Sequence, residues 1–208
     1  MTRNRVIVLC CAVILLTFAL AGSASSQSDG SGNVKTSIVP VHSFGTTTVI
    51  PAAGGSLSKN NDGVFGTIST SGLTPGHVVT LWWAIFNNPE FCANTTCAPT
   101  DFNTPAVNGS LQYGGGTIVD SGGRASFSGY LKKGDNTGAY AHPMFPNLPN
   151  PAPGIVDTKK AQIHMAIRSH GFPNMNPAIF QQQLTSFPGG CSVAMPPCAT
   201  VQAAVFIP

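Results

Sequence analysis

The residues with the most promising chemistry lie in one stretch, Gln162-Ile-His-Met-Ala-Ile-Arg-Ser-His170, which is followed by Gly171. Its residues alternate between two faces, and this period of two is typical of a half-buried β-strand. The apolar face would carry Ile163, Met165, Ile167 and Ser169. The other face would carry Gln162, His164, Ala166, Arg168 and His170. The pattern predicts a strand that gathers ionisable groups on one side.

Arg168 and His170 are the most coherent pair on that face. They are two residues apart, which is about 6.6 Å along a strand. Together they could hold an anionic group such as a carboxylate or a sulfate, and we take both as candidate ligand-binding residues. The alternative is structural: Arg168 would pair with an Asp or with loop carbonyls, and His170 would cap the turn at Gly171.

Metal binding is a weaker hypothesis. His164 and His170 are six residues apart, about 20 Å along a strand, so they cannot share an ion unless the strand breaks. Histidine stands near methionine three times, at His142-Pro-Met144, at His164-Met165 and at His170 with Met175. Imidazole and thioether suit Cu(I), which leaves a copper-binding protein as an alternative. Methionines also fill irregular space in cores and loops, so the sequence predicts no defined metal ligands and no cofactor.

Trp82 belongs to the strongest strand candidate, His77–Phe86, which is rich in apolar residues on both faces. A strand of this kind is usually central and covered on both sides. Trp82 is a candidate ligand-binding residue because an exposed Trp can stack on a sugar or peptide. Alternatively the long irregular insertion from Asn87 to Ser110 covers it.

The sequence offers little for catalysis. It has no Gly-x-Ser-x-Gly elbow. Glu90 and Asp101 flank a cysteine pair and could approach each other, as glycosidase chemistry requires of two carboxylates, but seven scattered acids make a chance pairing easy. We therefore predict no catalytic residue, and an unrecognised secreted enzyme is the last alternative.

The first residues predict export. Arg3 and Arg5 precede an apolar run, Val6–Leu20, and the small residues Ala21-Gly-Ser-Ala24 suit a cleavage site. This is the pattern of a secretory signal peptide over residues 1–24. The alternative is an uncleaved anchor, but the run is shorter than the ~20 residues that span a bilayer. Residues 25–34 are Ser/Gly-rich and predict a flexible leader, so the folded domain would be residues 35–208.

Four cysteines lie beyond the signal peptide. In an exported chain an even number favours disulfides, and the short spacings favour the local pairs Cys92–Cys97 and Cys191–Cys198. Each ring would stabilise the fold by roughly 2–2.5 kcal/mol. A zinc site is the alternative, although zinc ligands usually stand closer in sequence.

The composition indicates β structure and a neutral surface. The chain holds 23 Gly and 17 Pro, and its strand candidates are short and separated by turns. Without the signal peptide eight Lys/Arg face seven Asp/Glu, a balance that favours neither nucleic acid nor an anionic membrane. The fold predicted is a single-domain antiparallel β-sandwich, with a closed β-barrel as the alternative. Leu111–Asp120 and Arg124–Leu131 read as a hairpin.

Several phrases resemble a group of exported bacterial β-rich proteins to which no activity is assigned. The phrases are Gly72-Leu-Thr-Pro-Gly76, Trp82-Trp83 followed by Phe86-Asn87 and Pro89, Arg168-Ser-His-Gly171, and Gln183-Leu-Thr-Ser-Phe187 leading to Gly189-Gly-Cys191, Cys198 and Val201-Gln202. The likeness covers about residues 60–207. It implies secretion, one β-rich domain and locally paired cysteines, and it implies no site residues.

These observations predict a secreted or periplasmic, non-enzymatic binding or structural module. Its partner would be a small anion or a cell-surface molecule, without nucleic acid and without a membrane span after signal cleavage. The main alternative is a small-anion or copper-binding protein that uses the face of Arg168 and His170. Asn94 and Asn108 begin glycosylation sequons, which matter only in a eukaryotic host.

Overall fold

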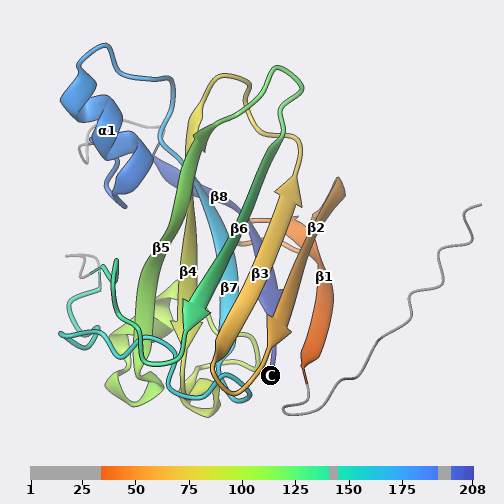
Figure 1. Ribbon diagram of the computed structural model, residues 1–208, viewed down its shortest axis with the longest axis vertical. Helices are drawn as coiled ribbons and strands as arrows, with labels where there is room; N and C mark the ends of the chain where they lie inside the picture. Colours follow the sequence, from red (N-terminus) through yellow and green to blue (C-terminus); the bar gives the residue numbers. More distant parts are fainter. Residues whose placement is uncertain (1–33, 141–144, 192–197) are drawn as a thin grey trace, which may run out of the picture. The chain divides into compact units, whose positions relative to one another are not determined.

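The computed structural model describes residues 34–140, 145–191 and 198–208. Within them eight strands form one antiparallel sheet in the order β5-β4-β7-β8-β1-β2-β3-β6 (Figure 1). The strands are β1 Lys35–Ser43, β2 Val49–Lys59, β3 Gly63–Thr70, β4 Val78–Phe86, β5 Gly109–Ile118, β6 Ala125–Lys132, β7 Gln162–Ser169 and β8 Ala199–Phe206. Three short 3-10 turns, Pro89–Phe91, Pro99–Asn103 and Pro105–Val107, lie between β4 and β5, and the α-helix α1 spans Pro177–Thr185. The predicted signal peptide lies outside the described residues.

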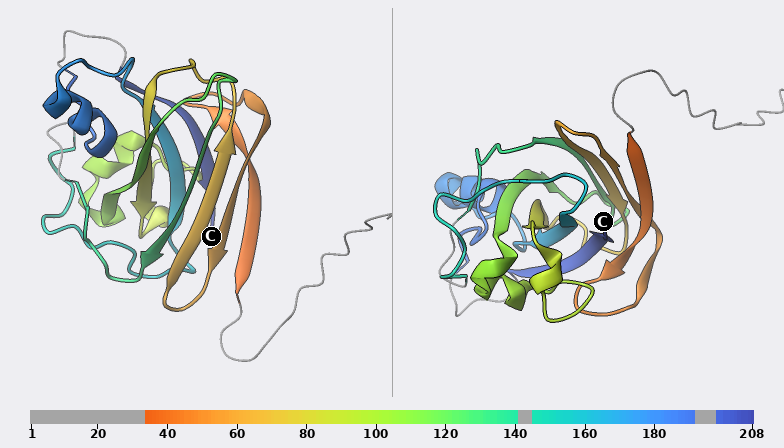
Figure 2. Two further views of the ribbon diagram at one scale, coloured as in Figure 1. Left: turned by 45° about the horizontal axis from the view of Figure 1, so that its top comes forward. Right: turned by 90° about the horizontal axis from the view of Figure 1, so that it is seen from below.

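The sheet curls until its two edge strands approach each other (Figure 2). This confirms the predicted all-β antiparallel class and gives it a barrel-like, nearly closed form, the architecture that the sequence left as its alternative. β5 and β6 lie side by side at the seam without a hydrogen-bonded ladder. The predicted hairpin of these strands is therefore wrong beyond its turn, where Asp120 N donates to Arg124 O at 3.1 Å. Each strand instead pairs with an earlier one, β5 with β4 and β6 with β3.

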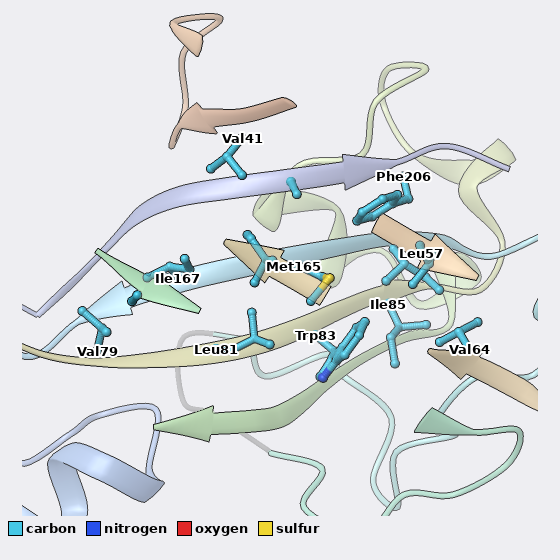
Figure 3. Close-up of a cluster of buried hydrophobic side chains, with 14 of the residues drawn as sticks. Val41, Leu57, Val64, Val79, Leu81, Trp83, Ile85, Met165, Ile167 and Phe206 are labelled. Atoms are coloured by element: carbon cyan, nitrogen blue, oxygen red, sulfur yellow. The ribbon is translucent and has the colours of Figure 1, made fainter. Parts of the chain in front are cut away.

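The main core fills the inside of the curled sheet (Figure 3). Alternate residues of every strand point inward, as the period of two requires. From β7 the inward residues are the predicted Ile163, Met165 and Ile167, all fully buried. The core also contains Val41, Leu57, Val64, Ile68, Val79, Leu81, Ile85, Ala204 and Phe206.

Trp83 is the largest side chain inside the sheet, and glycines make room for it. A Cβ on Gly114 of β5 would lie 2.7 Å from the indole nitrogen. A Cβ on Gly66 of β3 would overlap the far edge of the ring and lie 2.9 Å from Cζ3. Gly129 of β6 also faces the ring, at 3.5 Å. Three strands distant in sequence thus carry glycine where the indole passes, because interiors are close-packed.

β4 is buried along its whole length, as its two apolar faces predict. Its outward residues enter a second apolar cluster on the outside of the sheet, which includes Trp82, Phe86, Phe102, Leu111 and Phe187. The insertion between β4 and β5, the segment before β7 and the segment after α1 supply the covering residues. The outer face of β4 and β7 is therefore an interior surface. No helix among the described residues has the length and apolar character of a membrane span.

Candidate ligand-binding pocket

Small side chains leave a hollow on the outer face of the sheet. Ala166 of β7 pairs across the ladder with Ala203 of β8, and Ala84 of β4 pairs with His164 of β7. Alanine is depleted in strands, and here its small side chain leaves space between larger neighbouring side chains. The hollow above Ala84 and Ala166, called here the aromatic pocket, measures about 370 Å³. Its lining is Phe44, Trp82, Ala84, Phe86, Pro99, Phe102, Leu111, Phe145, His164, Ala166, Arg168, Phe187, Ala199 and Thr200.

Aromatic rings form the walls of the aromatic pocket. Phe86 of β4 stacks on Phe102 of the insertion with ring centroids 4.5 Å apart. Phe145 meets Phe102 edge-on at 5.2 Å. These walls come from segments far apart in sequence, and offset or edge-to-face contacts of this kind stabilise such clusters. Walls of this composition favour an apolar ligand body.

Trp82 is covered, with 2% of its surface exposed, so it offers no surface stacking platform. The rings packed against it are those of Tyr113, Tyr140 and Phe187, with centroids 5.1–5.7 Å away. The indole Nε1 donates to Thr80 Oγ1 at 2.8 Å. Trp82 thus serves as one wall of the pocket.

Arg168 is the charged group of the pocket. Its Nε donates to Phe187 O at 2.8 Å and its Nη2 to Cys198 O at 3.2 Å. The guanidinium carbon lies 4.3 Å from the centre of the Phe187 ring. In the described part of the chain no Asp or Glu forms an ion pair with it, and burial lowers its pKa. A half-buried cation without a counter-ion favours an anion, because a paired charge tolerates burial better.

His164 and Gln162 form a second polar element at the pocket floor. With the Gln162 amide oriented so that both of its ends are hydrogen-bonded, its nitrogen donates to Thr95 O at 3.1 Å, and its oxygen accepts from Cys97 N at 2.9 Å. The same oxygen accepts from His164 Nε2 at 2.6 Å. Burial lowers the pKa of His164 to about 4, so the ring is neutral at pH 7. With its proton on Nε2, the imidazole keeps an acceptor lone pair on Nδ1.

His170 does not share the pocket with Arg168. It is 2% exposed, and its Nε2 lies 2.7 Å from Thr80 Oγ1. Its Nδ1 lies 3.5 Å from Cys198 Sγ. Burial first, and the charge of Arg168 second, lower its pKa to about 4. The structure thus divides the predicted pair: Arg168 lines a hollow, and His170 ties β7 to β4 and to the second disulfide.

Both predicted disulfides are formed, Cys92–Cys97 and Cys191–Cys198. Asp101 supports the first ring, because its Oδ1 accepts from Ala93 N at 3.0 Å and its Oδ2 from Ala98 N at 2.7 Å. Both of its oxygens therefore accept hydrogen bonds from backbone amides. A catalytic pairing with Glu90 would need a carboxylate free of such bonds.

Two groups in the described residues have ligand atoms close enough for a metal ion, His170 with Cys191 and Cys198, and Cys92 with Cys97 and Asp101. In both groups the sulfurs are already joined to each other. Of the His–Met neighbours, Met165 points into the core away from His164, and Met175 is 97% exposed. His142 and Met144 lie outside the described residues.

The sequence reasoning named Arg168 and Trp82 but missed the pocket itself. Its walls include residues of three covering segments whose positions no periodicity predicts. A signal was present in the floor, where Ala84 and Ala166 stand at outward positions of otherwise large-residue strands.

Comparison of the chain with family models, with curated proteins and with solved structures found no match. The resemblance to exported bacterial proteins stays a prediction.

Proposed function

We propose that this protein is an exported, non-enzymatic binding module that holds a small ligand with an apolar body and one carboxylate. The observation that carries the proposal is Arg168, a half-buried cation without an acidic partner among the described residues, on the wall of an apolar pocket. A ligand carboxylate would supply the missing counter-charge, and its apolar part would cover the aromatic walls. Two disulfides and the signal-peptide pattern support export.

The test is calorimetric titration of the protein with decanoate and with decyltrimethylammonium, which pair one chain length with opposite charges. Decanoate is expected to bind, and the cation at least tenfold more weakly. Acetate, which has the charge without the chain, is expected to bind far more weakly still, since each buried methylene contributes about 0.8 kcal/mol. Equal binding of anion and cation would refute the role of Arg168, and equal binding of acetate and decanoate would refute the role of the apolar walls.

Arg168→Met tests the same contact from the protein side. The variant keeps a long apolar side chain but removes a charge-assisted interaction of about 1.5–3 kcal/mol. The expected loss of decanoate affinity is therefore roughly 10- to 100-fold. Arg124→Met is the matched control, because Arg124 is exposed and lies outside the pocket. An affinity for decanoate that falls equally in both variants would contradict the proposal.

A further inference from the structure

A second hollow of about 590 Å³ adjoins the aromatic pocket and shares Phe44, Pro99 and His164 with it. Hydroxyl side chains are frequent in its lining, from Ser43, Thr46, Thr47 and Thr96. None of the described residues that line it is Lys, Arg, Asp or Glu. We call it the hydroxyl chamber. The two hollows together make a site with a cation in one part, aromatic rings in the middle, and hydroxyl side chains and His42 beyond.

His164 stands where the two hollows meet, and the Cys92–Cys97 loop fixes which of its nitrogens can accept a hydrogen bond. Thr95 O and Cys97 N orient the Gln162 amide, so that the Gln162 oxygen faces His164 Nε2. An oxygen only accepts, so the proton of the neutral imidazole lies on Nε2. Nδ1 is left as an acceptor, and no side chain or backbone group of the described residues is hydrogen-bonded to it.

Displacement of water by a bound ligand would make this acceptor selective. His164 is 7% exposed, and an acceptor that a ligand covers without pairing costs about 1–3 kcal/mol. A ligand hydroxyl would satisfy Nδ1, whereas a methyl or ether group at the same place would leave it unpaired. Sites built to hydrogen-bond a ligand group reject analogues that lack it for this reason.

We infer that the ligand is an elongated hydroxy acid, whose carboxylate lies at Arg168, whose apolar section crosses the aromatic pocket, and whose hydroxyl donates to His164 Nδ1 at the entrance of the hydroxyl chamber. The inference rests on the proposed function, because it takes the carboxylate contact as given. Arg168 and His164 are four residues apart on one face, about 13 Å along the strand. An extended aliphatic chain of medium length spans such a distance, so ω-hydroxydecanoate is a suitable probe.

The experiment compares ω-hydroxydecanoate with ω-methoxydecanoate by calorimetry at pH 7. The two probes have the same carboxylate and chain, but only the first can donate a hydrogen bond. The hydroxy acid is expected to bind roughly fivefold more tightly, as one net hydrogen bond predicts. A ratio near one in the unaltered protein would overturn the inference, and this result does not depend on how any variant folds.

His164→Phe removes the acceptor while keeping a ring, and it is expected to bring the ratio to about one. His77→Phe is the control, because His77 lines neither of the two hollows, and it should keep the ratio. A ratio that survives His164→Phe would overturn the assignment to His164. If decanoate binds no more tightly than decyltrimethylammonium, the proposed function fails. If decanoate is preferred but ω-hydroxydecanoate and ω-methoxydecanoate bind equally, the inference about the hydroxyl group fails alone.

Discussion

Two buried histidines should make the protein lose stability as the pH falls from 6.5 toward 4. Burial lowers the pKa of both His164 and His170 from 6.5 to about 4. Between these values the unfolded chain binds protons that the folded chain excludes, so stability is complete above pH 6.5 and falls as the pH drops toward 4. At 1.36 kcal/mol for each pH unit, the loss approaches about 3 kcal/mol for each histidine. Domains are usually stable by about 5–15 kcal/mol, so both losses together are a large fraction of the total.

The assay is urea unfolding at pH 7.0, 5.5 and 4.5, with the free energy of unfolding taken from each curve. Carboxylates whose pKa is lowered, such as Asp135 and Asp157, contribute mainly below this window, because their stabilisation is lost as the pH falls through and below 3.8. His164→Gln and His170→Gln each remove one titrating ring. Each variant should reduce the drop in stability between pH 7.0 and 4.5 by about half.

A free energy of unfolding that stays constant between pH 7.0 and 4.5 would refute this reasoning. So would proton NMR that shows either ring taking up its proton near pH 6.5 in the folded protein. His77→Gln is the control for the general effect of replacing a histidine, since the His77 ring is hydrogen-bonded to Ser169 Oγ and not to His164 or His170.

Two further substitutions test the inside and the outside of the sheet. Gly66→Ala should lower the free energy of unfolding by about 2 kcal/mol, because its Cβ meets the Trp83 ring and lies 3.0 Å from Met165 Sδ. Gly129→Ala, whose Cβ would lie 3.5 Å from the same ring, should change it by less than about 1 kcal/mol. Equal melting temperatures of the two variants would contradict the packing argument. Ala166→Leu should raise the pocket floor and weaken decanoate binding more than tenfold in calorimetry, while Ala106→Leu, outside the pocket, should not; unchanged affinity in Ala166→Leu would place the ligand elsewhere.

Local chemistry made several features predictable. The strand at residues 162–170 was recognised from alternation alone, and its inward set of Ile163, Met165 and Ile167 is the buried set in the structure. Both disulfides followed from short spacings, because a short loop between two cysteines closes easily. The two apolar faces of His77–Phe86 correctly indicated a central strand covered on both sides.

Other features depended on contacts between distant segments. The expected hairpin failed because β5 and β6 each found a partner formed earlier in the chain, which leaves them at the seam. The sequence could not predict whether Arg168 forms an ion pair, since the fold decides which of several carboxylates lies near it. His170 was expected to bind a ligand together with Arg168, but its ring nitrogens contact Thr80 and Cys198 instead.

The sequence by itself determined which side of each strand is apolar and which cysteines join, because alternation and short loops are properties of neighbouring residues. Only the tertiary structure decided that the polar side of β7 is covered, that the cover leaves a hollow over Ala84 and Ala166, and that Arg168 stands in its wall without an acid among the described residues. The physical reason is that burial and charge pairing depend on which distant segments meet, and three irregular segments, which no periodic pattern describes, make that choice here.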